Sequence, residues 1–375
     1  MKKLVADRSG SEIKYVISED GEPYAYGVYS IDDANAGDVI AAVCRENSRS
    51  TGGFFADGGL KRTDFIGGQC GVLKPGDYFP AAVLTGPRGQ KGRLLSREIS
   101  FCGFYVFVKF VPATAGLKPS VSVSKKIADK EAAEKLKSAV LDFVKDFDSC
   151  YSPEITVRTA AEGNEKKTLG ELAVFMERFR EIAGKIRKRE FLKPGAILFK
   201  KSFPDYIVSA YRDNSFAEVL TGDASLSLEI MNRFKDGPSV PEIRTVSGSF
   251  SVFDVDEGAS KLPRYTGRNF YTGSGARITY DETEAMHVFD VNSGGSGKTA
   301  AEVNLEACRE IARFVSVRNI AGIIMIDFIG MKDQKSRDNV VEEMRLLAKK
   351  DYQKFEIYGF TKLEILECSR SRRIK

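Results

Sequence analysis

The stretch from residue 285 to residue 328 constrains the fold of this chain more than any other. Residues 285–291 form a short apolar run typical of a strand, and residues 299–314 place apolar side chains at the spacing of one helix face. Residues 320–328 are almost continuously apolar, as in a buried central strand. Because a crossover helix joins strands that run in the same direction, this stretch predicts a β-α-β unit whose two strands end at one edge of a sheet.

Each of these two strands carries an aspartate near its carboxyl end, Asp290 in the first and Asp327 in the second. The edge where parallel strands end is where α/β proteins place their sites. Two carboxylates that meet there repel each other unless a cation lies between them, and a hard divalent ion such as Mg²⁺ or Mn²⁺ suits these ligands. Such an ion could polarise a phosphoryl oxygen and lower the pKa of a bound water. The alternative is that one aspartate caps a helix or lies in a surface loop.

A phosphate-binding loop is a competing interpretation of the same stretch. Residues 292–299, Asn-Ser-Gly-Gly-Ser-Gly-Lys-Thr, follow a strand and open a helix. The first glycine of the motif G-x-x-x-x-G-K-[ST] is replaced by Asn292, so the motif fails where its tight turn begins. Only 76 residues follow Thr299, fewer than the rest of a P-loop sheet needs. An NTPase built around Gly297-Lys298-Thr299 is therefore the less favoured alternative.

The counts of histidine and cysteine exclude several kinds of site. A single histidine excludes mechanisms that need two imidazoles, and it excludes a histidine-rich zinc site. This residue, His287, lies three positions before Asp290, so alternation along the strand places it on the opposite face, where we interpret it as a packing residue. The six cysteines include no C-x-x-C pair, so no zinc motif is found.

Charge and hydropathy indicate the location and the class of partner. The net charge of 57 − 52 = +5 allows a polyanionic partner without requiring one. The N-terminus begins with basic residues but reaches no apolar stretch, so no signal peptide is predicted. No apolar run is long enough to span a bilayer. We therefore predict a cytoplasmic protein with reduced thiols.

The rest of the chain predicts a mixture of strands and helices. Residues 1–34 predict a hairpin that turns at Asp20-Gly21. Short strands between glycines in residues 38–66, closed by 71–84 and 92–97, favour a small barrel over a parallel sheet. The other predicted elements are strands at 99–110, 154–158, 196–199 and 207–211 and helices at 129–147 and 226–234.

Three further segments carry predictions that the structure can test. Thr168-x-x-Glu171 matches a capping box and predicts the start of a helix. Residues 236–262 are rich in Gly, Ser and Asp and predict a loop insertion. Residues 181–201 hold seven Lys or Arg against two Glu, which indicates either a solvated helix face or a patch that faces phosphates.

The motifs around the two aspartates, taken in this order, resemble the ribonuclease E/G family of bacterial endoribonucleases. Weaker similarity extends over the whole chain, with residues 37–66 resembling the family's OB-fold and residues 91–94 its closing segment. The motifs that carry the resemblance are Asp281-x-Thr283-Glu284-Ala285-Met286, Phe289-Asp290-Val291-Asn292-Ser293-Gly294, Asn304-Leu305-Glu306-Ala307, Glu310-Ile311-Ala312-Arg313 and the run of residues 322–331.

The resemblance implies an α+β fold with several subdomains. It implies an RNase H-like subdomain that is split around an inserted OB-fold β-barrel and a 5′-sensor subdomain, followed by a DNase I-like α/β catalytic subdomain. The implied boundaries are 1–34 plus 208–265 for the RNase H-like part, 35–97 for the OB-fold, 98–207 for the sensor and 266–375 for the catalytic part.

The resemblance also implies an activity and its catalytic residues. In the family, two aspartates bind a catalytic Mg²⁺ and an asparagine two residues after the first helps to orient the site; these roles fall on Asp290, Asp327 and Asn292. The implied reaction is hydrolysis of single-stranded RNA to 5′-phosphate and 3′-hydroxyl ends, in RNA processing and decay. The alternative is an RNA-binding protein of the same fold that has lost catalysis, which the retention of all three residues disfavours.

A sensor for the 5′-monophosphate of the substrate is implied as well. The family uses an Arg-Thr pair after a strand, and Arg158-Thr159 matches it. An arginine fork and a hydroxyl suit a terminal phosphate. Gly103 and Phe107 fall on the strand that lines the family's pocket, although Phe107 is bulkier than the usual aliphatic residue. Lys354 stands where an arginine is usual, which implies a looser fit for the phosphate.

In the OB-fold, alternation along a strand sets the roles of neighbouring aromatic residues. Phe54 and Phe55 face opposite sides, so one can pack inside the barrel while the other stacks on a base. By resemblance, Phe55 and Phe65 are the stacking residues, and Lys91 lies nearby for a phosphate. The alternative is that these aromatic rings only fill the barrel.

The last residues depart from the family pattern. Family members usually continue into a C-x-x-C zinc link and a small dimerisation domain, whereas residues 368–375 contain no cysteine pair. We therefore expect a monomer, or a dimer that forms without a zinc link.

Overall fold

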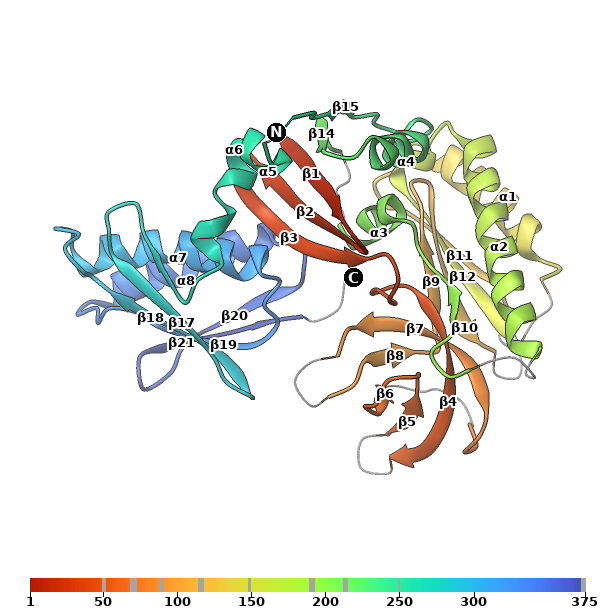
Figure 1. The fold of residues 1–375 in the computed structure, drawn as a ribbon, viewed down its shortest axis with the longest axis horizontal. Coiled ribbons are helices and arrows are strands. Elements are labelled where there is room, and N and C mark those ends of the chain that lie inside the picture. The colour runs from red at the N-terminus through yellow and green to blue at the C-terminus, as the bar shows by residue number, and fades with distance from the viewer. Residues whose placement is uncertain are drawn as a thin grey trace. The chain divides into compact units, whose positions relative to one another are not determined.

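The computed structural model describes residues 1–371 apart from 49–51, 68–72, 88–90, 114–117, 148–149, 189–192, 212–214 and 249. The fold is mixed α+β, and its strands form four sheets (Figure 1). The chain forms two compact units. We call residues 1–31, 215–234 and 239–375 the split unit, and residues 32–214 with 235–238 the inserted unit.

A closed β-barrel begins the inserted unit. Each strand pairs with the next in the order β4-β5-β6-β8-β7, and β7 pairs back with β4, which leaves the five strands without a free edge. Its interior is filled by small and aliphatic side chains such as Ile40, Ala56 and Leu95, all completely buried. This closed five-stranded barrel is consistent with an OB-fold, as the glycine-punctuated strands predict. Its strands are β4 Val39–Ser48, β5 Gly53–Asp57, β6 Asp64–Ile66, β7 Tyr78–Thr85 and β8 Leu94–Ser96. A further strand, β13 Ile197–Phe199, pairs with the first two residues of β4.

A four-stranded sheet and two helices complete the inserted unit. Its strand order is β11-β12-β10-β9, and its core is aromatic, with the rings of Phe110 and Phe179 stacked at 4.0 Å between centroids. Its elements are β9 Ile99–Cys102, β10 Val106–Pro112, β11 Ser120–Val123, α1 Lys130–Val144, β12 Tyr151–Val157, the short 3₁₀ turn η1 Thr159–Ala161 and α2 Glu165–Arg187.

The predicted capping box is wrong. Helix α2 begins four residues earlier, with Asn164 instead of Thr168 at its N-cap, and the Thr168 hydroxyl donates to the Asn164 carbonyl. The Glu171 carboxylate does not cap the helix but accepts a hydrogen bond from the backbone N–H of Phe104. A capping pattern is local, so it cannot distinguish an acid that caps its own helix from one with a distant partner.

The strand predicted at residues 207–211 is also wrong, because residues 207–210 belong to helix α3 Phe203–Ala210 and Tyr211 is its C-cap. Ser202 caps this helix by accepting from the backbone N–H of Asp205, and Pro204 occupies the first turn, where its missing N–H costs nothing. The β-branched pair Ile207-Val208 suggests a strand, but both side chains are buried on one side of the helix. Burial therefore overrides a weak local preference.

The first sheet of the split unit has the strand order β15-β14-β1-β2-β3. The predicted hairpin is confirmed between β2 and β3, where Asp20 and Gly21 both have positive φ, at 52° and 74°. The strands and the helix after β14 are β1 Lys2–Ser9, β2 Glu12–Glu19, β3 Glu22–Ser30, β14 Glu218–Thr221, α4 Ala224–Phe234 and β15 Glu242–Thr245.

The segment 236–262 is more than the predicted loop. It contributes β15 to this sheet, followed by α5 Val252–Val255, α6 Glu257–Ser260 and the start of the 3₁₀ turn η3 Leu262–Tyr265. Val252 and Ala259 are buried against Val5 and Val16 of the sheet. Short helices with a few apolar anchors lack the periodicity that a sequence needs to reveal them.

The second sheet of the split unit confirms the predicted β-α-β unit. Its order is β16-β17-β18-β19-β21-β20, and β18 and β19 run parallel, joined by helix α7. Helices α7 and α8 lie along one face of this sheet (Figure 1), and apolar residues of both pack with Phe289 and Ile326 in one core. The elements are β16 Asn269–Tyr271, β17 Arg277–Glu282, β18 Met286–Asn292, α7 Ala300–Val317, β19 Gly322–Asp327, α8 Gln334–Lys350, β20 Phe355–Phe360 and β21 Ile365–Arg370.

Two general expectations can be compared with the described part of the chain. None of its helices combines the length and the apolar character that crossing a membrane requires. The five cysteines that it contains are free thiols, and Cys70 lies outside the described residues.

Candidate active site

The two aspartates lie side by side at the end of the parallel strand pair. Asp290 of β18 and Asp327 of β19 are direct register partners, so their Cα atoms are separated by one strand spacing, about 4.8 Å. The preceding register pair, Phe289 and Ile326, is completely buried under the helices. Alternation therefore turns both aspartates to the opposite, uncovered face, where both are exposed.

Asn292 belongs to the same arrangement. It is the last residue of β18, two positions after Asp290 and so on the same face of the strand. Its side-chain nitrogen donates to the Asp290 carboxylate with a nitrogen–oxygen distance of 2.6 Å. This bond fixes the orientation of the carboxylate and leaves its other oxygen uncommitted.

The structure brings together most of the predicted sensor residues in the inserted unit. Arg158 follows β12, and its guanidinium group donates to the Gly103 carbonyl and lies 3.6 Å from the Cys102 sulfur. The hydroxyl of Thr159 is 2.9 Å from that of Ser124. Arg158 therefore has a fixed position at the end of the sheet, with most of its donors left for another acceptor.

Glu171 holds the loop that carries the Gly103 carbonyl. Its carboxylate accepts hydrogen bonds from three consecutive backbone N–H groups, those of Phe104, Tyr105 and Val106, at 2.8–3.0 Å. A Cβ atom at Gly103 would stand 2.1 Å from the Glu171 carboxyl carbon, which explains the glycine. The sequence does not reveal this role, because Glu171 lies 67 residues after Phe104 and such a distant pair leaves no local pattern.

The remaining two predicted sensor residues differ in their surroundings. Phe107 is half-buried on β10, opposite Cys102 on one side and Thr156 on the other. Lys354 belongs to the split unit, where its ammonium group pairs with Glu356 at 2.5 Å.

The barrel carries an aromatic pair on its outer surface. Phe55 and Phe65 are register partners on β5 and β6, both half-buried, with ring centroids 5.6 Å apart in an edge-to-face arrangement. Phe54 packs against the barrel core, so the two neighbouring aromatic residues of β5 face opposite sides as alternation requires. Lys91 is exposed.

Comparison with known proteins identifies the family of this chain. The family model described as the ribonuclease E/G family matches residues 108–373, well over half of the chain. The chain belongs to the ribonuclease E/G family.

Individual relatives are distant but cover most of the chain. Ribonuclease G of Haemophilus influenzae is 26% identical over 312 residues, which cover 80% of this chain and 60% of that protein. Ribonuclease G of Escherichia coli K12 is 26% identical over 311 residues, 80% of this chain and 61% of that protein. Ribonuclease E of Buchnera aphidicola from Schizaphis graminum is 27% identical over 321 residues, 80% of this chain and 31% of that protein. The chain thus spans about 60% of the length of the ribonucleases G that it matches.

The carboxylate pair of this ribonuclease E/G chain fits a magnesium ion better than a zinc ion. Among the described residues, no group of three or more His, Cys, Asp or Glu side chains could hold a metal, and neither Asp290 nor Asp327 forms an ion pair with Lys or Arg. Zinc sites use three or four protein ligands, most of them His nitrogens or Cys sulfurs. Mg²⁺ is held by one or two carboxylates and keeps several waters, which two exposed, unpaired carboxylates can provide.

The segment that resembles a P-loop uses its polar groups for other purposes. Thr299 is the N-cap of α7 and forms a capping box with Glu302, and the Lys298 ammonium group pairs with Glu306. The hydrogen bonds from Lys298 and Ser274 lower the pKa of Glu306 to about 2. The hydroxyl and the cation that a P-loop would offer to a nucleotide are therefore engaged within the helix start.

His287 of β18 and Asn304 of α7 are buried polar residues of the same unit. His287 is 4% exposed, with Nδ1 2.8 Å from the Tyr280 hydroxyl, which agrees with the predicted packing role. Asn304 of α7 is completely buried; its amide donates to the Ile329 carbonyl at 2.8 Å and accepts from the Ile329 N–H at 3.1 Å. Asn304 thereby holds the loop that follows Asp327. An amide on the apolar face of a predicted helix is the sequence feature that could have revealed it.

Proposed function

We propose that this chain is an endoribonuclease that hydrolyses phosphodiester bonds of single-stranded RNA, leaving 5′-phosphate and 3′-hydroxyl ends, with a role in RNA processing and decay. The observation that carries this proposal is the register pairing of Asp290 with Asp327 at the open edge of a parallel strand pair. Membership of the ribonuclease E/G family supports it.

Asp290, Asp327 and Asn292 form the proposed catalytic group. The two carboxylates would hold one Mg²⁺ or Mn²⁺ ion, which when bound supplies positive charge to the scissile phosphoryl group and acidifies a water. The Asn292 amide holds the Asp290 carboxylate in one orientation, so that this ligand needs no reorganisation when RNA arrives. The exposure of both carboxylates on the uncovered face of the sheet leaves room for an extended RNA strand.

Arg158 and Thr159 form the proposed site for a 5′-monophosphate. A guanidinium group with free N–H donors and a neighbouring hydroxyl can bind a dianionic phosphate through charge-assisted hydrogen bonds. Gly103 and Phe107 would line this site. We propose that the enzyme therefore prefers RNA with a 5′-monophosphate over RNA with a 5′-hydroxyl.

The barrel is the proposed RNA-binding surface. Phe55 and Phe65 offer half-buried ring faces on which bases can stack, and Lys91 offers a charge for the backbone. The proposed subdomains are those that the family resemblance implies, with RNase H-like and DNase I-like parts in the split unit and OB-fold and sensor parts in the inserted unit. We propose a cytoplasmic location, with which the free thiols of the described residues agree.

Cleavage of matched RNAs by the wild-type chain tests the proposal. One single-stranded oligonucleotide is prepared with a 5′-monophosphate and with a 5′-hydroxyl, and each is incubated with Mg²⁺ or with EDTA. We expect cleavage only with Mg²⁺, faster for the monophosphate, with products that carry 3′-hydroxyl ends. Binding of both RNAs without cleavage under any metal condition would instead identify the inactive RNA-binding alternative.

A further inference from the structure

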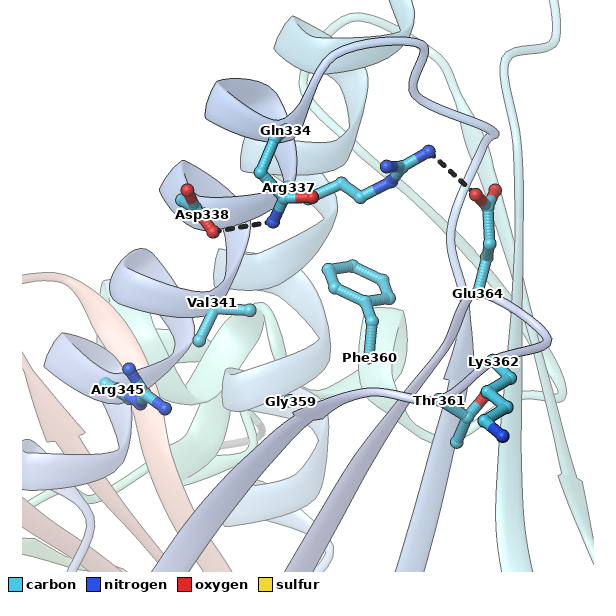
Figure 2. A pocket seen from close by; sticks show the side chains of 10 residues that line it. All are labelled: Gln334, Arg337, Asp338, Val341, Arg345, Gly359, Phe360, Thr361, Lys362 and Glu364. Atoms are coloured by element: carbon cyan, nitrogen blue, oxygen red, sulfur yellow. Dashed lines mark hydrogen bonds and ion pairs between the residues drawn. The ribbon is translucent and has the colours of Figure 1, made fainter.

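A polar pocket lies beside the proposed catalytic edge, between helix α8 and the β20–β21 hairpin. It has a volume of about 430 Å³, in the range of pockets that bind small ligands. Figure 2 shows one wall formed by the helix and the other by the hairpin, with Arg337 and Phe360 between the walls and Arg345 and Lys362 at opposite ends. Its lining includes Arg337, Val341, Arg345, Phe360, Thr361 and Lys362.

The pocket adjoins the loop and strand that position Asp327. Ile365 is the register partner of Asp327, and the preceding residue, Glu364, lines the pocket. Arg337 donates both to Glu364 at 2.7 Å and to the Met331 carbonyl, in the loop after β19, at 2.7 Å. One end of the pocket is therefore tied to the two segments that flank Asp327.

Two positively charged side chains of the pocket lining, Arg345 and Lys362, are available to bind an anion. Arg337 pairs with Glu364, and the Gln334 amide donates to the Asp338 carboxylate at 2.9 Å, so both acidic groups of the lining have partners (Figure 2). Within the described part of the chain, Arg345 and Lys362 form no ion pair. Both are exposed, one on each wall.

The other lining groups suit a nucleotide. The Thr361 hydroxyl accepts from the backbone N–H groups of Leu363 and Ile365, which leaves its own O–H to donate to an anion. Phe360 and Val341 are half-buried and give the pocket an apolar wall (Figure 2). Cations and a hydroxyl donor beside an apolar wall match a phosphate joined to a nucleobase.

We propose that this pocket binds a short segment of the substrate RNA away from the scissile bond, with one backbone phosphate on Arg345, another on Lys362 and a base against Phe360. This inference rests on the proposed function only in taking RNA as the ligand. None of the lining residues belongs to the carboxylate pair, the sensor or the barrel. A bound RNA segment in this pocket would position the rest of the RNA strand at Asp290 and Asp327.

RNA affinity, measured without cleavage, tests the pocket. In an Asp327→Asn background, fluorescence anisotropy reports the Kd of a labelled single-stranded oligonucleotide in Mg²⁺ buffer at several salt concentrations. The pocket variant is Arg345→Ala with Lys362→Ala, and Arg345→Glu is a second variant. Lys349→Ala is the matched control, because Lys349 is exposed on the same helix but does not line the pocket.

We expect the double variant to weaken RNA binding about tenfold and to reduce the salt dependence by about one to two phosphate contacts, while the control stays within about twofold. Unchanged affinity in the double variant, or an equal loss in Lys349→Ala, would overturn the proposal. A parallel arm titrates uridine monophosphate and inorganic phosphate; binding of these through Arg345 without an effect on RNA affinity would assign the pocket to a free nucleotide and overturn it as well.

The outcome separates this inference from the proposed function. Pocket-dependent RNA binding by a wild-type chain that never cleaves RNA would support the pocket and contradict the endoribonuclease. Mg²⁺-dependent cleavage by the wild-type chain, with RNA affinity unaffected by the pocket variants, would support the endoribonuclease and overturn the pocket.

Discussion

The carboxylate of Glu171 and the carboxylates of Asp290 and Asp327 differ in how many of their oxygen lone pairs accept hydrogen bonds within the protein. Glu171 in the inserted unit accepts from three backbone N–H groups and holds a buried loop. Asp290 and Asp327 in the split unit are exposed, and among the described residues they accept one side-chain hydrogen bond between them, from Asn292. A saturated carboxylate is a structural element, whereas two adjacent, uncommitted carboxylates repel each other and attract a cation. Substitutions at the two places should therefore have opposite effects on stability and on chemistry.

Asp327→Asn should have the largest effect on activity. The change removes one of the two negative charges at the strand ends, and we expect Mg²⁺-dependent cleavage to fall roughly 10³-fold or more, since a metal ion supplies several kcal/mol of charge stabilisation. RNA affinity and the urea midpoint should stay close to wild type. Asp281→Asn, an exposed aspartate of the same sheet that pairs with Arg268, is the control and should retain activity. Wild-type cleavage rates in Asp327→Asn would contradict the mechanism.

Glu171→Ala should have the largest effect on stability. It leaves three backbone N–H groups of a buried loop without acceptors, so we expect the free energy of unfolding in urea to fall by about 2–4 kcal/mol. The same loop carries the carbonyl that holds Arg158, so the rate ratio between 5′-monophosphate and 5′-hydroxyl RNA should approach one. Glu177→Ala on the same helix, an exposed residue paired with Arg180, should change stability by less than about 0.5 kcal/mol.

Gly103→Ala tests the same contact from its other side. The added methyl group would meet the Glu171 carboxylate well inside contact distance, so the loop or the carboxylate must move, at a cost of about 1–3 kcal/mol. We expect a reduced preference for the 5′-monophosphate and an unchanged rate on 5′-hydroxyl RNA. Gly170→Ala is the matched control, because its Cβ would meet nothing within 4 Å in the middle of α2, and it should stabilise by about 0.5–1 kcal/mol. If wild type and Gly103→Ala preferred 5′-monophosphate RNA to the same extent, this loop would have no part in binding the 5′-phosphate.

Glu306→Gln should have the smallest effect, and that effect should depend on pH. The pKa of Glu306 in the folded chain, about 2, lies below its ordinary value of 4.5, so its ionised form stabilises the fold above pH 4.5. That contribution is lost as the pH falls from 4.5 towards 2. We expect Glu306→Gln to lower stability at pH 7 by at most about 1 kcal/mol and to match the wild type near pH 2. A constant difference between pH 7 and pH 2 would mean that the Lys298 pair contributes nothing through charge.

The sequence predicted the elements that depend on regular hydrophobic periodicity. The β-α-β unit around Asp290 and Asp327 and the barrel strands follow from alternation and from glycine punctuation, and the structure confirms both. Helix α3 was missed because Ile207 and Val208 have a local strand preference that burial overrides. The segment after α4 was missed because α5 and α6 are too short to show a period.

The candidate site divides in the same way. The meeting of the two aspartates could be predicted because parallel topology alone brings strand ends together. The roles of Glu171 and Asn304 could not, because each depends on a hydrogen bond to backbone far along the chain, and backbone partners leave no trace in residue identity. Family resemblance supplied Arg158 and Thr159, for which the local sequence offers only a strand end.

The position of the β18–β19 pair has a consequence for the order in which the molecule acquires its parts. Asp327 follows Asp290 by only 37 positions, and α7 accounts for half of the residues between them, so closing this loop costs little chain entropy. Glu171 reaches back 67 residues to Phe104, across strands of a different sheet. Contacts that are local in sequence form early and with few prerequisites. We therefore expect the Asp290–Asp327 pair to form earlier in folding than the contact between Glu171 and the loop that carries the Gly103 carbonyl.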